Sequence, residues 1–151
     1  MKQMKSKVFA YITHGHRLLV FRHPAVPEAG IQVPAGTIKA GEHPEAAVLR
    51  EAFEETGIAG LTLSGLLGEQ TQDRADFGRD EIPHRRFYHL CCTGSPPEMW
   101  KHEETDPADG EPDPLLFEFF WAPLPDGVPP WIAHHGKMLP RLVVKLFSEG
   151  V

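Results

Sequence analysis

Short apolar runs separated by turn-forming residues dominate the chain and predict a protein rich in β-strands. Residues 7–13 and 17–21 are rich in Val, Ile, Leu and aromatic side chains, and a His-Gly-His turn lies between them. This arrangement is typical of a β-hairpin. Residues 84–93 and 115–122 predict two further strands, the second apolar on both faces and therefore buried. Residues 58–69 mix glycine with leucine and predict one or two more.

Two segments carry the spacing of helices. Pro44 suits a first helical position and Gly57 suits the left-handed residue that ends many helices, so we expect a helix over residues 44–56. Apolar residues recur at helical spacing within residues 131–148 and predict a second helix there, with a start at Pro140 as the alternative. Strands interleaved with two helices imply a sheet covered on both sides. Residues 94–114 hold five prolines and seven acidic residues, which predicts a long polar connection without regular structure.

The first helix has two chemically different faces. Glu51, Glu54 and Glu55 fall within about 100° of arc, because positions three and four apart are neighbours on a helix. Carboxylates crowded in this way repel one another unless a cation offsets them, and Mg²⁺ prefers such oxygen ligands. We expect the opposite face to pack on the sheet through Ala46, Leu49, Ala52 and Phe53.

Composition and charge narrow the class of protein. The chain has 151 residues, which fits one domain over residues 1–151, and a net charge of −6. That charge argues against nucleic-acid binding, although a bound metal would still allow an anionic small substrate. Cys91 and Cys92 are adjacent and would point to opposite faces of a strand, so we expect free thiols and a cytoplasmic protein. No apolar run approaches the length of a membrane span.

The residues from Gly36 to Ile58 follow the spacing G-x5-E-x7-R-E-U-x-E-E-x-G-U, where U is apolar. This spacing resembles the Nudix box, and the chain is identified as similar to the Nudix hydrolases. The resemblance implies an α/β (α+β) fold, an α/β/α sandwich with a mixed β-sheet between helices. It also implies a metal-dependent enzyme that cleaves a pyrophosphate bond in a nucleoside diphosphate linked to another group.

The resemblance assigns roles within the box. Glu51, Glu54 and Glu55 match the metal-binding glutamates for Mg²⁺ (or Mn²⁺), and the carbonyl of Gly36 is a further candidate ligand. Arg50 is expected to orient a glutamate through its forked guanidinium; the alternative is a surface pair with Glu54. Glu42 is expected to support the loop or a metal-bound water. Glu54 is our choice for the general base, with Glu103, Glu104 and Asp106 as alternatives.

Substrate contacts are expected outside the box. Arg22 and one of Arg85 and Arg86, for which we choose Arg86, lie near strands that approach the phosphates in this fold. Trp100 either anchors its segment to the core or stacks on a base, and we include it among the candidates. Phe77 and Tyr88 are weaker candidates for stacking.

The substrate class is open at this point. The downstream proline of ADP-ribose pyrophosphatases and the tyrosine of dinucleoside polyphosphate hydrolases are both missing. A nucleoside triphosphate or related small nucleotide is our choice. The alternative function is a non-catalytic nucleotide-sensing protein of the same fold. Dimers are common in the family, and the sequence leaves a homodimer open.

Overall fold

The computed structural model describes residues 3–24, 30–71, 81–103, 116–129 and 135–148. One mixed sheet forms its centre, with the strand order β4-β5-β1-β2-β7-β6 and β3 paired to β1. The parallel pair is β1 with β5, and the other neighbouring strands run antiparallel. The strands are β1 (Gln3–His14), β2 (Arg17–Arg22), β3 (Ala35–Thr37), β4 (Leu61–Thr71), β5 (Glu81–Cys92), β6 (Met99–Glu103) and β7 (Leu116–Pro123).

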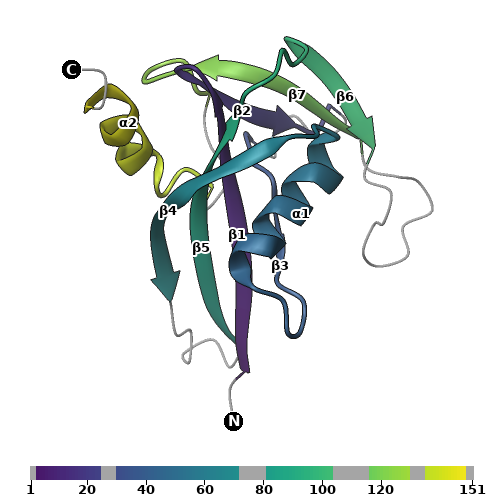
Figure 1. The fold of residues 1–151 in the computed structure, drawn as a ribbon, viewed down its shortest axis with the longest axis vertical. Helices are drawn as coiled ribbons and strands as arrows, with labels where there is room; N and C mark the ends of the chain where they lie inside the picture. Colours follow the sequence, from purple (N-terminus) through teal and green to yellow (C-terminus); the bar gives the residue numbers. More distant parts are fainter. Residues whose placement is uncertain (1–2, 25–29, 72–80, 104–115, 130–134, 149–151) are drawn as a thin grey trace.

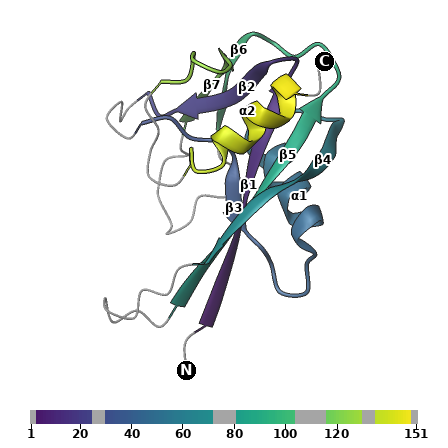
Figure 2. The same cartoon turned by 90° about the vertical axis from the view of Figure 1, so that its left-hand side faces the viewer.

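Two helices cover opposite faces of this sheet. Helix α1 (Pro44–Thr56) packs on one face and helix α2 (Leu139–Ser148) on the other, as the two views in Figure 1 and Figure 2 show. The predicted α+β sandwich with a mixed sheet is therefore confirmed, and α1 has the bounds that the sequence predicted. Within the described ranges, neither helix has the length and apolar character needed to cross a membrane.

One edge of β1 is divided between two partners. Its last residues pair with β2, where Thr13 lies opposite Leu18. Further back along the strand the same edge pairs with β3, where Val8 lies opposite Gly36. The box therefore begins on a strand that β1 holds directly in place.

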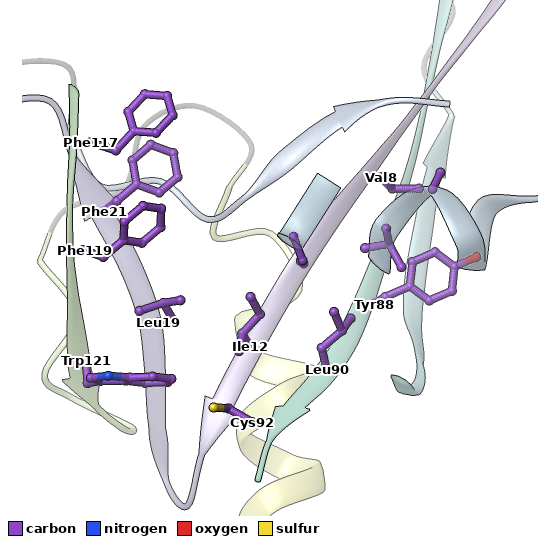
Figure 3. Close-up of a cluster of buried hydrophobic side chains, with 14 residues drawn as sticks. Val8, Ile12, Leu19, Phe21, Tyr88, Leu90, Cys92, Phe117, Phe119 and Trp121 are labelled. Carbon is purple, nitrogen blue, oxygen red and sulfur yellow. The ribbon is translucent and has the colours of Figure 1, made fainter. Parts of the chain in front are cut away.

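The core consists of one cluster on each face of the sheet. On the α1 face, residues of β2 and β7 such as Phe21 and Phe119 face residues of β1 and β5 such as Ile12 and Leu90 (Figure 3). Helix α1 closes this cluster with Ala47, Val48 and Ala52. On the α2 face, Phe9 stacks on Phe87 with ring centroids 4.6 Å apart, and Leu142 of α2 is fully buried.

Two sequence predictions of secondary structure need correction. Residues 94–114 were expected to lack regular structure, yet β6 lies among them because Met99–Glu103 pairs along β7. The terminal helix was expected over about residues 131–148 and is shorter: α2 begins at Leu139, beside Pro140, which the sequence offered as an alternative start, and it follows a turn at residues 135–138. Residues 131–134 lie outside the described residues.

Candidate functional site

Helix α1 carries the predicted carboxylates, and its ends follow from local sequence. Pro44 occupies the start, and Glu45 lies in the first turn, where a negative charge favours the positive end of the helix dipole. The helix ends at Gly57, whose φ of 76° is left-handed and whose N–H donates to the carbonyl of Phe53. These two signals set the bounds of the helix that carries the glutamates.

The orientation of α1 differs from the predicted one. The helix buries Ala47, Val48, Ala52 and Thr56, whereas Phe53 is 54% exposed. The predicted packing stripe is therefore wrong at Phe53 and at Ala46, which is also exposed. The reason is that Glu51 and Glu55 turn towards β3, so that the apolar contact with the sheet shifts around the helix.

Two close approaches join the helix to β3. The backbone N–H of Ala35 donates to Oε2 of Glu55 over 2.9 Å. A Cβ placed on Gly36 would lie 2.0 Å from Cδ of Glu51, a distance that no side chain tolerates. Glycine at position 36 is thus the residue that leaves room for the Glu51 carboxylate.

Arg50 is the hub of the site. Its guanidinium makes a forked pair with Glu42, through Nε to Oε2 at 2.8 Å and Nη2 to Oε1 at 3.0 Å. Nη1 donates to Glu51 at 2.8 Å and to Glu54 at 3.3 Å, and Nη2 donates to the carbonyl of Thr37 at 3.3 Å. One cation therefore holds three glutamates and the end of β3 together.

The surroundings of Glu42, Glu51 and Arg50 shift their pKa values in different ways. The hydrogen bonds from Arg50, and a further one from the backbone N–H of Lys39, lower the pKa of Glu42 to about 2. Burial raises the pKa of Glu51, and the bond to Arg50 offsets part of that rise. The carboxylates in turn raise the pKa of Arg50, so the guanidinium stays charged.

The donor chemistry of the group suits a hard divalent cation. Glu51, Glu54 and Glu55 offer carboxylate oxygens on one side of α1, and the side chain of Glu54 is 54% exposed. In the described ranges, however, no three His, Cys, Asp or Glu side chains are already gathered closely enough to hold a metal ion. Glu51 and Glu54 face Arg50 and Glu55 faces Ala35, so the donor set fits such an ion once carboxylates exchange these partners.

The predicted substrate residues lie on three different strands. Arg22, at the end of β2, pairs with Glu118 at 3.0 Å and lies 4.6 Å from the centre of the Phe120 ring. Arg86 of β5 points to the α1 face and pairs with Glu69 at 3.3 Å. These two arginines are held by separate neighbours and are not brought together.

Trp100 of β6 is bound to the end of α1. Its indole Nε1 donates to the carbonyl of Thr56 at 3.0 Å, and its ring stacks on Phe119. His102, two residues on, donates from Nε2 to the carbonyl of Glu54 at 3.0 Å. Sequence reasoning missed His102, because the strand that presents it was not predicted.

The remaining candidates are placed as follows. Tyr88 is buried in the core cluster of the α1 face. The structure describes no side chain for Glu103, and Phe77, Glu104 and Asp106 lie outside the described residues. Cys92 joins that same cluster, whereas Cys91 lies near His89 on the other face, and both thiols are free as predicted.

Comparisons with known proteins agree on one family. The model of the NUDIX domain matches residues 4–142. A search of curated proteins finds no match.

Solved structures of this fold resemble most of the chain. A MutT NUDIX hydrolase from Burkholderia pseudomallei is 25% identical, with 93% of this chain and 99% of that chain covered and a TM-score of 0.60. The NUDIX domain of Shewanella oneidensis NrtR, complexed with ADP ribose, is 17% identical, with coverage of 97% and 90% and a TM-score of 0.65. A UDP-X diphosphatase is 16% identical, with coverage of 99% and 63% and a TM-score of 0.61.

Proposed function

This chain belongs to the Nudix family as a pyrophosphohydrolase, and we propose that it hydrolyses a pyrophosphate bond in a small nucleotide. The substrate class is a nucleoside diphosphate linked to another group, with nucleoside triphosphates as the first choice. The observation that carries the proposal is the position of Glu51, Glu54 and Glu55 beside β3, where Arg50 holds the first two and the backbone N–H of Ala35 holds the third. The likeness to a MutT NUDIX hydrolase at 25% identity supports hydrolysis as the reaction.

Nudix hydrolases generally use divalent metals, and we assign Mg²⁺ (or Mn²⁺) to this group. Glu51, Glu54 and Glu55 would hold the ion, together with the carbonyl of Gly36. When bound, such an ion neutralises phosphate oxygens and lowers the pKa of a coordinated water. The close approach of Gly36 to Glu51 supports the assignment, because it places a main-chain segment beside the carboxylate.

The chain's own residues prepare the water and hold the group in place. We assign Glu54 as the base, because its carboxylate is the most exposed of those that contact Arg50. Glu54 takes a proton from water as the water oxygen bonds to phosphorus. The bridging P–O bond breaks, and its electron pair leaves with the departing oxygen. Arg50 and Glu42 hold the glutamates in place throughout.

Substrate contacts are proposed for Arg22, Arg86 and Trp100. Arg86 is supported by its direction, because it points to the α1 face beside Glu69. Arg22 has less support, because it pairs with Glu118 and contacts Phe120, which packs against the cluster of the α2 face. Trp100 borders the end of the catalytic helix, where its ring can contact a ligand.

We propose a cytoplasmic location for a single Nudix domain over residues 1–151. The two free thiols support a reducing setting. The net charge of −6 favours a small-molecule partner over nucleic acid, and a homodimer stays open.

A panel of nucleoside triphosphates, nucleotide sugars and dinucleotides, incubated with Mg²⁺ or Mn²⁺, tests the proposal. We expect metal-dependent release of a mononucleotide from a triphosphate, resolved by chromatography, and no release in excess chelator. Hydrolysis in isotopically labelled water should place the label on a product phosphate. Binding of a nucleotide by calorimetry with no turnover of any compound would instead favour the non-catalytic sensor.

A further inference from the structure

A cavity of about 360 Å³ lies beside the C-terminal end of α1. Residues 56–59 form one wall, residues 94–97 form another, and Cys92 and Trp100 complete the lining. None of the glutamates of the box lines this cavity. Its volume lies within the range of small-molecule sites in proteins, which are typically apolar with a few polar groups.

The loop wall is held from both ends by side chains of the sheet. His14 donates from Nε2 to the carbonyl of Gly94 over 2.9 Å. The indole Nε1 of Trp121 donates to the carbonyl of Pro97 over 2.9 Å. Pro96 and Pro97 restrict the backbone further. The loop is therefore fixed in shape before any ligand arrives.

The helix wall and the aromatic wall are fixed in the same way. Trp100 donates to the carbonyl of Thr56 at 3.0 Å, and its ring is nearly parallel to that of Phe119, with centroids 5.3 Å apart. The hydroxyl of Thr56 donates to the carbonyl of Ala52 at 2.7 Å and accepts from the N–H of Ile58 at 3.0 Å. Hydrogen bonds therefore hold the loop wall, the helix wall and the aromatic wall of the cavity in place.

The lining indicates the chemistry of the ligand. Of the described residues that line the cavity, none is charged, and the larger ones are Ile58, Trp100 and two prolines. The cavity lies at the negative end of the α1 dipole, and the last turn of that helix has no basic residue. A phosphate would therefore be disfavoured, whereas a flat ring could stack on the indole and bond to the loop backbone.

We propose that this cavity binds a flat aromatic or heteroaromatic ring without negative charge. The ring can come from two sources, either the base of the hydrolysed nucleotide or a separate small molecule. In both cases the ligand touches the last turn of α1, which carries Glu54 and Glu55. The first source rests on the proposed function, whereas binding of the ring itself does not.

Binding to the full chain can be measured by NMR without any turnover. Indole-3-carboxamide is the probe, and its matched anion is indole-3-carboxylate. We expect saturable shifts of the Trp100 indole N–H, assigned with Trp100→Phe, and of the Gly57 amide, with a Kd on the order of 1 mM. The carboxylate should bind roughly threefold or more weakly, because the helix end repels it.

Two tryptophan variants test whether the carboxamide binds in this cavity. Ala59 is exposed and lines the cavity, so Ala59→Trp should obstruct it and weaken the carboxamide about tenfold while the fold remains intact. Val144→Trp, at a position that is 64% exposed on α2, adds the same bulk elsewhere and should leave the Kd unchanged. Absence of a saturable shift in the wild-type protein, or equal affinity in both variants, would overturn the proposal.

Competition identifies the source of the ring. If AMP displaces the carboxamide from the metal-free protein, the cavity takes the base of the nucleotide. If AMP and the carboxamide bind together, the cavity serves a separate ligand. Either result is independent of whether hydrolysis is observed, so failure of the proposed enzyme and failure of the ring site remain distinguishable.

Discussion

Gly36 and Glu51 are in such close contact that a Cβ on the glycine would lie 2.0 Å from Cδ of the glutamate. The contact joins the end of β3 to the middle of α1, and the obstructing group is the end of a flexible side chain. An added methyl would therefore displace the carboxylate without unfolding the protein. The absence of a side chain at Gly36 therefore determines where Glu51, a proposed metal ligand, can lie.

Gly36→Ala should lower kcat by about 100-fold or more, because Glu51 would be pushed out of the proposed metal site. Turnover of the best substrate from the panel measures this loss, and thermal unfolding should change by only a few degrees. Val144→Ala is the control, since Val144 is 64% exposed on α2, away from the glutamates and the cavity. Full activity of Gly36→Ala would contradict the role of Glu51.

Arg50→Lys should reduce kcat by about 10- to 100-fold with little change in KM. Lysine keeps the charge but cannot reproduce the fork to Glu42 together with the bonds to Glu51 and Glu54. Steady-state kinetics separate the two constants. Arg17→Lys serves as control, because Arg17 pairs with the exposed Glu98 and should tolerate the change. A rise in KM alone would assign Arg50 to substrate binding instead.

Glu55→Gln should lower turnover by about 100-fold or more and weaken binding of Mn²⁺, measured by calorimetry. Glutamine has the same size, and its amide oxygen can still accept the N–H of Ala35, so the fold should persist. Glu45→Gln, in the first turn of the same helix, is the control. Unchanged Mn²⁺ affinity in Glu55→Gln would remove Glu55 from the metal site.

Trp100→Phe should lower the free energy of unfolding by about 1–3 kcal/mol, measured by urea denaturation. Phenylalanine can keep the stacking on Phe119 but leaves the carbonyl of Thr56 without its donor. The comparison is Trp121→Phe, which removes a similar bond to Pro97. We expect kcat to fall only for Trp100→Phe, because only that bond ends on α1. Unchanged stability with a raised KM would indicate a base-stacking role without anchoring.

His89 should make stability depend on pH. It is 2% exposed, hydrogen-bonded to Thr13 at 2.7 Å, and its Nδ1 has no partner among the described residues. Burial, aided by the charge of Lys145, lowers its pKa from 6.5 to about 4. Between these values the unfolded chain binds a proton that the folded chain does not. Stability should therefore fall as pH falls from 6.5 towards 4, by up to about 1.4 kcal/mol per pH unit.

Urea denaturation at several pH values measures this slope. His89→Gln cannot titrate, but its side-chain amide can still bond to Thr13, so the part of the slope due to His89 should disappear. An identical slope in wild type and variant would show that other groups cause the acid sensitivity.

Local signals made the centre of the fold predictable. Pro44 and Gly57 mark the ends of α1 within the sequence itself, and the helix has the bounds they indicate. Strand β6 could not be predicted, because Met99–Glu103 is extended through its pairing with β7 across a proline-rich segment. Local composition does not report such a distant partner.

The candidate site was predicted in its members but not in all of its contacts. The spacing of the box indicated Arg50 and the glutamates as candidates. It did not predict that the paired hydrogen bonds of the Arg50 guanidinium would be made to Glu42. The rotation of α1 that exposes Phe53 follows from the contacts of Glu51 and Glu55 with β3, which are tertiary. The metal roles and the substrate contacts remain predictions.

Because one edge of β1 pairs with both β2 and β3, the position of the box in the sheet does not depend on the length of the connection between β2 and β3. Because Val8 lies opposite Gly36 and Thr13 opposite Leu18, one strand sets the register of both the hairpin and the box. Residues added between β2 and Gly30 would leave these pairings in place, because the bridge of Phe21 to Gln32 begins only after Gly30. A residue inserted in β1 between Val8 and Thr13 would instead reverse the faces of the strand. We therefore expect added residues to be tolerated in the connection after β2 and to abolish activity when they are inserted in β1.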